Sequence, residues 1–147
     1  MGTQENKASG RRFVEEVINR GNLAVIDELS GPNFVDHAAP PGVPADREGS
    51  KAFFAMLRAA FPDLHATIED QVAEGDRVVQ RVTSHGTMRG DFQGMPASGK
   101  EATWSGIHIT RYADGKVVEH WAVIDQLGML TQLGFAQAPG QPAGVAR

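Results

Sequence analysis

The sequence predicts an α+β fold in which helices come first and a largely antiparallel sheet follows. Three observations support this class. Apolar residues recur at helical spacing before Pro62, they alternate with polar residues after it, and glycine-containing turns separate the later segments. Helices followed by meandering strands are typical of α+β domains. We therefore expect three N-terminal helices on one side of a curved sheet, with a conical cavity between the layers.

Length and composition are those of one ordinary globular domain. The chain has 147 residues, of which 41% are hydrophobic and 22% are charged. Its net charge of −4 argues against nucleic acid as a partner. No apolar run approaches the roughly 18 residues that a membrane span needs. Cysteine is absent, which excludes disulfides and thiolate ligands. A cytoplasmic location, with no membrane contact, is the expectation that fits.

The first half of the chain predicts three helices and one short strand. The first helix carries apolar residues at helical spacing and ends near Gly21, and Asn22 caps a short second helix. A short strand is expected over residues 33–37. The third helix begins at Asp46, an N-cap candidate, and ends before Pro62, whose ring cannot continue it.

The second half predicts four strands and a closing helix. Strands are expected from Leu64 onward, over 77–87, over 100–112 and over 116–124, with a long glycine-rich loop at 88–99. The closing helix spans 126–133 and ends at Gly134. We assign residues 1–134 to a single domain. The tail 135–147 is rich in Ala, Pro, Gly and Gln and is expected to be mobile.

The hairpin around Asp114-Gly115 carries the two most informative residues, His108 and His120. If residues 113–115 form a three-residue loop, His108 lies opposite His120 on one face of the sheet. A two-residue loop instead pairs His108 with Trp121 and turns His120 to the other face. We favour the first arrangement because a type I turn followed by a glycine bulge suits Ala-Asp-Gly.

Two imidazoles on one face of a sheet are suited to proton transfer. Imidazole titrates near pH 6.5 when unperturbed, and a positioned acid or base contributes roughly 10²–10⁴-fold to a rate. The alternative is that both are hydrogen-bonded or solvent-facing sheet residues without a catalytic role. We expect His108 and His120 to be catalytic. The expected contacts to a small hydrophobic substrate are Trp104, Phe34, Phe53, Phe54 and Ala122 as apolar walls, with Arg81 and His37 as polar contacts.

No motif for a metal or a cofactor is present in the sequence. It lacks a His-x-x-x-His pair, a glycine-rich phosphate loop after a strand, and a nucleophile elbow. We therefore expect neither a metal nor a cofactor. On the other face of the hairpin, Ile107, Ile109, Trp121 and Val123 would be exposed in a monomer. Exposed apolar groups of this kind usually mark an interface, so we expect a homodimer through the outer sheet face.

A series of short segments along the chain occurs in the order and spacing of a known family. The segments are Phe13–Glu16, Asn33–His37, Ala59–Leu64, Ile68–Asp70, Gly86–Thr87, Gly90–Pro96, Ser98–Lys100, Asp114–Lys116, Glu119–Trp121 and Gln126–Gly128. Together they resemble the SnoaL-like polyketide cyclases over nearly the whole chain, from about residue 6 to residue 134.

This resemblance implies the nuclear-transport-factor-2-like fold, a cone made by a curved antiparallel sheet over three helices. It also implies a cofactor-free pocket and a dimer or tetramer. Cyclases of this family close a polyketide ring by intramolecular aldol condensation, with an aspartate base on the last strand and an assisting histidine on the strand before it. His108 falls at the histidine position. The aspartate position holds Ala122.

The alanine at that position leaves two hypotheses open. In the first, the chain is an enzyme in which His108 polarises a carbonyl or steadies an enolate and His120 replaces the missing base. In the second, it is a non-catalytic protein that binds a hydrophobic metabolite. Hydroxylases, epoxide hydrolases and ketosteroid isomerases share the fold. The Asp-Arg-Asp grouping of the hydrolases cannot be assembled from these strands, and Tyr112 is the only tyrosine that an isomerase could use.

Overall fold

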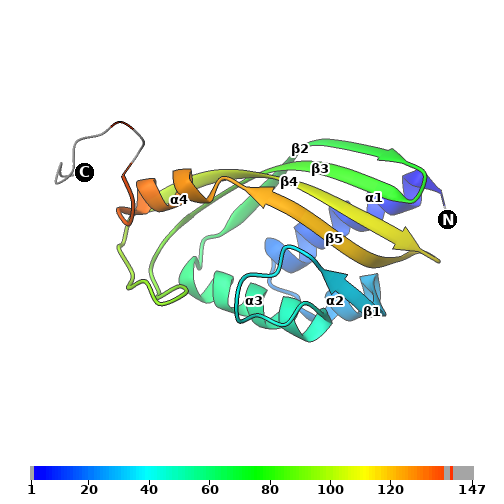
Figure 1. Cartoon of the computed structure of the whole chain (residues 1–147), viewed down its shortest axis with the longest axis horizontal. Coiled ribbons are helices and arrows are strands. Elements are labelled where there is room, and N and C mark those ends of the chain that lie inside the picture. Colours follow the sequence, from blue (N-terminus) through cyan, green and yellow to red (C-terminus); the bar gives the residue numbers. More distant parts are fainter. Residues whose placement is uncertain (1, 138–139, 141–147) are drawn as a thin grey trace.

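A computed structural model describes residues 2–137 and residue 140, and it has the predicted α+β architecture (Figure 1). The N-terminal helices lie on one side of a long curved sheet, and a short C-terminal helix lies at one end of it. The helices are α1 (Thr3–Arg12), η1 (Phe13–Ile18), α2 (Ala24–Leu29), α3 (Arg47–Ala60) and α4 (Gln126–Leu133). The strands are β1 (Ser30–Asp36), β2 (His65–Glu74), β3 (Arg77–Thr87), β4 (Glu101–Ala113) and β5 (Lys116–Ile124).

The sheet has the strand order β1-β5-β4-β3-β2 and is mixed rather than wholly antiparallel. Strands β2 to β5 form the expected antiparallel meander. Strand β1 adds to the outer edge and runs parallel to β5. Short turns force consecutive strands to run antiparallel, but β1 pairs with a strand that comes about 80 residues later, and no local turn sets its direction.

Two helices begin at capping residues that the sequence supplies, whereas the predicted cap of α2, Asn22, is wrong because Leu23 holds that position without a side-chain cap bond. Asp46 accepts a hydrogen bond from the Gly49 backbone at 2.8 Å and caps α3, as predicted. Asp125 accepts from Gly128 at 2.9 Å and caps α4 in the same way. At the end of α4, Gly134 has φ 92°, a left-handed conformation that glycine adopts without strain.

The buried residues described form four clusters, and two of them flank the middle of β4. One part is aromatic and includes Phe61, Met88, Trp104 and Leu133. The other includes Phe34, Val78, Tyr112 and Val117. Along the inner face of β4, Trp104 and Tyr112 are buried, whereas Gly106, His108 and Thr110 between them are only partly buried. The middle of this face therefore carries polar groups that the core leaves partly exposed.

Two further expectations concern the ends of the chain and membranes. The expected mobile tail, 135–147, falls mostly outside the residues that the structure describes. Among the helices of residues 2–137, none is long and apolar enough to cross a membrane.

Candidate functional site

The β4–β5 hairpin places His108 and His120 on the same face, although its turn differs from the one we favoured. The loop has two residues, Asp114 and Gly115, with φ 51° and 76°, values that suit a type I′ turn. A bulge follows, so that Arg111 faces Glu119 and one residue of β5 is left unpaired. The extra residue restores the parity that a two-residue loop alone would have reversed.

The predicted pairing of the two histidines is therefore wrong by two positions. His108 lies opposite Ala122, and His120 lies opposite Thr110. The two imidazoles are diagonal neighbours on one face. Long side chains reach such neighbours easily, and the rings meet with centroids 5.2 Å apart and planes 18° apart.

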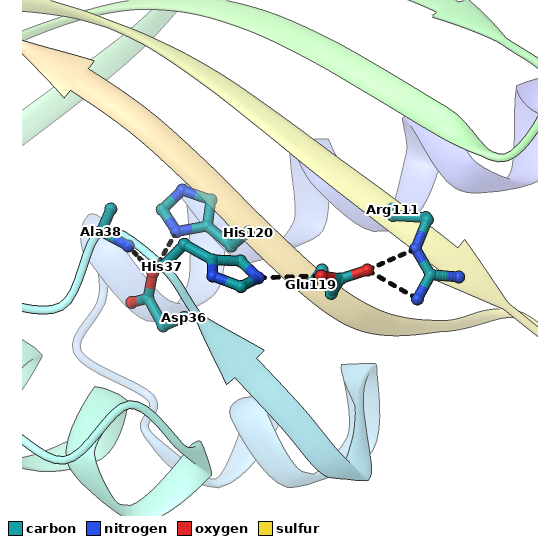
Figure 2. A network of polar contacts seen from close by, with 6 residues as sticks. All are labelled: Asp36, His37, Ala38, Arg111, Glu119 and His120. Carbon is teal, nitrogen blue, oxygen red and sulfur yellow. Dashed lines mark hydrogen bonds and ion pairs between the residues drawn. The ribbon is translucent and has the colours of Figure 1, made fainter.

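Three side chains form a hydrogen-bonded chain across β1, β5 and β4. Asp36, at the end of β1, holds Nδ1 of His120 at 2.7 Å from its Oδ1, and Figure 2 shows this contact. The other nitrogen of that ring, Nε2, lies 2.9 Å from Nδ1 of His108. We call this arrangement the Asp36–His120–His108 chain.

The positions of the hydrogens in this chain follow from its carboxylate end. An ionised Asp36 can only accept, so His120 donates from Nδ1. Neutral His120 then presents the lone pair of Nε2, and His108 donates to it from Nδ1. This leaves the second nitrogen of His108, Nε2, with its lone pair unused within the chain.

The pKa values agree with this assignment. Burial by itself would raise the pKa of Asp36, but the hydrogen bond and charge of His120, together with the Ala38 backbone N–H, outweigh it and leave the pKa below its usual value. Burial, followed by repulsion from a charged His120, lowers the pKa of His108 to about 4, and the charge of Asp36 offsets this only in part. His108 is therefore a neutral ring near pH 7.

The free nitrogen of His108 faces a position without a side chain. A Cβ placed on Gly106 would lie 3.3 Å from Nε2 of His108 and 3.1 Å from Cγ1 of Ile124. Since Gly106 precedes His108 by two residues on the same face, its lack of a side chain leaves that nitrogen uncovered on one side. The arrangement offers a base or donor at the inner surface of β4.

The predicted apolar contacts lie on the inner side of the sheet. Trp104 is buried and packs on Phe61, with ring centroids 5.4 Å apart. Phe34 is buried in the core part around Tyr112. Phe53 and Phe54 are partly buried on α3 and pack against the aromatic part of the core. Ala122 pairs with His108 and so lies beside it.

Both predicted polar contacts lie on the outer face instead. Arg81, on β3, lies opposite Ile107 on β4 and forms an ion pair with Asp70. His37 binds Glu119 and stacks on Trp121 with ring centroids 5.0 Å apart. The error for Arg81 comes from parity: Gln80, not Arg81, is the β3 residue beside His108. The error for His37 has the same origin, since its neighbour Asp36 is the one that turns inward.

Asp36 is the site residue that the sequence reasoning missed. Its position before His37 at the end of a short strand was visible, but its partner was not. Asp36 reaches His120 only because β1 pairs parallel to β5 with Asp36 opposite His120. No local sequence signal encodes that long-range pairing. A carboxylate at a strand end, near two inward histidines, is the only hint available.

The described part of the chain shows no arrangement suited to a metal ion. Within residues 2–137, no group of three or more His, Asp or Glu side chains converges as metal ligands would. A carboxylate and two imidazoles in hydrogen-bond contact can pass a proton between them.

The chain resembles known proteins along most of its length. The family described as SnoaL-like polyketide cyclase matches residues 8–133. Aklanonic acid methyl ester cyclase DnrD from Streptomyces peucetius is 30% identical over 120 residues, which cover 81% of this chain and 72% of that protein. Nogalonic acid methyl ester cyclase from Streptomyces nogalater is 29% identical over 121 residues, covering 79% and 88%.

Solved structures share the same architecture. TsrD from Streptomyces laurentii has a TM-score of 0.85 and 29% identity, with 92% of this chain and 99% of that chain covered. Wild-type IdmH from Streptomyces antibioticus has a TM-score of 0.76 and 36% identity, with 88% and 98% covered. The predicted fold class is thereby confirmed.

Proposed function

Since the chain belongs to the SnoaL-like polyketide cyclase family, we propose that it is a cofactor-independent acid/base enzyme that closes a ring in a polyketide-like carbonyl compound. The observation that carries this proposal is the Asp36–His120–His108 chain, a proton path that begins at a carboxylate and ends at a free imidazole nitrogen. The curated relatives are named as cyclases of methyl esters of polyketide acids, which supports this substrate class.

The first step is removal of a proton beside a carbonyl group by Nε2 of His108. His108 does not keep the charge, because its pKa is lowered to about 4. As Nε2 binds the substrate proton, Nδ1 passes its own proton to Nε2 of His120. The positive charge then lies on His120, next to the Asp36 carboxylate 2.7 Å away. The C–H bond has broken and its electron pair remains on the substrate as an enolate.

The second step returns a proton. The enolate carbon attacks a second carbonyl of the same molecule, one C–C bond forms, and the electron pair of that carbonyl moves to its oxygen. His108 now carries a hydrogen on Nε2 and donates it to this oxygen, while His120 returns its extra proton to His108. One proton has moved from carbon to oxygen, and the enzyme is unchanged.

The Asp36–His120–His108 chain also accounts for the alanine at the position where the family has an aspartate base. Ala122 lies opposite His108, so an aspartate there would stand beside that ring. In this protein the carboxylate comes from Asp36 and acts through His120. We propose that His108 takes the role of the base that the family aspartate has. The negative charge that stabilises the transferred proton is then on Asp36.

Turnover of a candidate substrate tests this function. Purified protein is incubated with aklanonic acid methyl ester or nogalonic acid methyl ester, and the isomeric cyclised product is separated by chromatography. Replacing His108 by Ala is expected to lower turnover by roughly 10²–10⁴-fold, because the proton acceptor is lost. The matched control is His85→Ala, which removes an exposed histidine from the neighbouring strand and is expected to leave turnover unchanged.

The same assay separates the enzyme from a binding protein. Unchanged turnover in His108→Ala would remove that residue from the mechanism. An inactive natural protein whose Ala122→Asp variant cyclises the substrate would indicate a binding function on a cyclase scaffold, the hypothesis that Ala122 favours.

A further inference from the structure

Asp36 stands at the edge of the sheet. It is the last residue of β1, an edge strand that pairs with β5 within the described part of the chain. The register between the two strands shifts between Ser30 and Val35, so regular pairing resumes only at the end of β1. Backbone bonds hold the main chain here, from Asp36 N–H to Ala45 O at 3.0 Å and from His37 N–H to His120 O at 2.9 Å. The Ala38 N–H also donates to Oδ1 of Asp36 at 2.9 Å. Side-chain contacts on the outer face add to this hold.

The outer face of the same strand pair carries a second carboxylate–imidazole contact. His37, the residue after Asp36, places Nε2 2.8 Å from Oε2 of Glu119, the residue before His120. Figure 2 shows the two contacts side by side, one from each pair of neighbours. Adjacent residues of a strand point to opposite faces. The strand pair is therefore joined on both faces at the same level.

Glu119 is itself fixed from β4. Arg111 contacts a single oxygen of Glu119, Oε1, through both Nε and a terminal nitrogen at 2.7 Å, which leaves Oε2 to His37. The hydrogen bond from His37, followed by that from Arg111, lowers the pKa of Glu119. His37 also lies flat on Trp121, with ring planes 9° apart. We call the residues His37, Glu119, Arg111 and Trp121 the outer clamp.

We infer that the outer clamp is a positioning device that holds Asp36 in register with His120 and so keeps the carboxylate at the end of the proton path. Its role in turnover rests on the proposed function, but its role in placing Asp36 does not. None of the four residues touches the free nitrogen of His108, so they act through Asp36.

The arrangement of charges on the two strands favours this register over its neighbours. At the end of β1, Asp36 points inward and His37, the next residue, points outward. On β5, His120 points inward and Glu119 points outward. A slip of one residue exchanges the faces of the β1 side chains. His37 would then stand inside with His120, and Asp36 outside with Glu119, so that like groups would meet. The native register joins each carboxylate to an imidazole and is favoured on both faces.

The first test measures the Asp36–His120 contact directly in solution. In the natural protein, proton NMR is expected to show a low-field signal for the Nδ1 hydrogen of His120, and carbon NMR an Asp36 pKa below its usual value. His37→Ala and Glu119→Ala should weaken that signal and raise the Asp36 pKa. The Asp36 carboxyl group would remain partly buried but would lose its hydrogen bond to His120. Glu119→Gln keeps an acceptor for His37 and is expected to retain most of both properties.

A matched control comes from the same face of the sheet. Asp70→Ala removes the exposed ion pair with Arg81, which joins β2 to β3 and does not touch β1. It should leave the His120 signal and the Asp36 titration unchanged. His37→Phe retains a ring to stack on Trp121 but loses the bond to Glu119, and it serves where an alanine variant does not fold.

Kinetics provide an independent readout. His37→Ala and Glu119→Ala are expected to lower kcat by about ten- to a hundredfold with little change in KM, because a small misplacement of a catalytic group is costly. An unchanged His120 signal and Asp36 titration in the folded clamp variants would overturn the inference. Absence of turnover in the natural protein would instead count against the proposed function, and the NMR result would still decide the role of the clamp.

Discussion

Asp36 is the residue that gives direction to the two neighbouring imidazoles. Without it, His108 and His120 could share a hydrogen in either sense. With an ionised carboxylate 2.7 Å from Nδ1 of His120, each ring donates from Nδ1 and accepts or is free at Nε2. The low pKa of His108 follows from the same geometry, since burial and a charged neighbour both oppose its protonation. The Asp36 carboxylate thus determines, through His120, that Nε2 of His108 carries no hydrogen.

The titration of His108 predicts how stability depends on pH. An imidazole in the unfolded chain titrates near pH 6.5, whereas the folded protein lowers the pKa of His108 to about 4. Between these values only the unfolded state binds the proton, so the free energy of unfolding decreases as the pH falls from 6.5 to 4. The full loss is about 3 kcal/mol. The lowered pKa of Asp36 acts at more acidic pH, where its contribution is lost as the carboxylate becomes protonated.

Urea unfolding at pH 7 and pH 4.5 measures this effect. His108→Gln should lose about 2–3 kcal/mol less stability on acidification than the natural protein, because the group that resists protonation is gone. His85→Gln changes an exposed histidine and should follow the natural protein. Parallel losses in all three proteins would show that His108 is not buried as a neutral ring.

At the scale of elements, the β4–β5 hairpin shows what a sequence pattern can and cannot determine. Alternation placed both histidines on strands, and the Asp114-Gly115 pair marked the turn. The face that they share depends on a bulge that leaves one β5 residue unpaired. We expected a three-residue loop to supply the extra residue. The parity was correct because the extra residue lies in the strand instead, a local choice that pattern alone does not reveal.

Strand β1 shows the opposite case. Its existence was predicted, but its partner was not, because it pairs with the last strand in the sheet. Two predictions depended on this pairing. Asp36 was overlooked as a site residue, and His37 was expected to contact the substrate although it lies on the outer face. The existence of the helices, strands and turn could be derived from spacing, whereas the bulge in β5 and the contacts between segments distant in sequence required the structure.

At the scale of the whole molecule, the outer face of the sheet exposes apolar residues that a single copy leaves in water. Val123 is 80% exposed and Ile107, its partner on β4, is 43% exposed. The same face carries both signs of charge beside them, in Arg81 and Asp70. We propose that a second copy covers this face, since a two-fold arrangement brings apolar groups together and opposite charges across the interface.

Light scattering coupled to size exclusion measures the mass of the particle. We expect a dimer at micromolar concentration, and Val123→Glu should shift it toward the monomer because a charge would be buried at the contact. Met56→Glu, at an exposed position on α3 away from the outer sheet face, is the matched control. A monomeric natural protein at these concentrations would remove the interface from the account.

The positions of the hydrogens on the two histidine rings decide whether the proton path exists. Nitrogen-15 NMR of the protein labelled at histidine reports which ring nitrogens carry hydrogen. Near neutral pH we predict that His120 and His108 are both protonated at Nδ1, with an unprotonated Nε2 on His108, and that Asp36→Asn abolishes this pattern. Hydrogen found on Nε2 of a neutral His108 in the natural protein at that pH, unaffected by Asp36→Asn, would contradict the proton path.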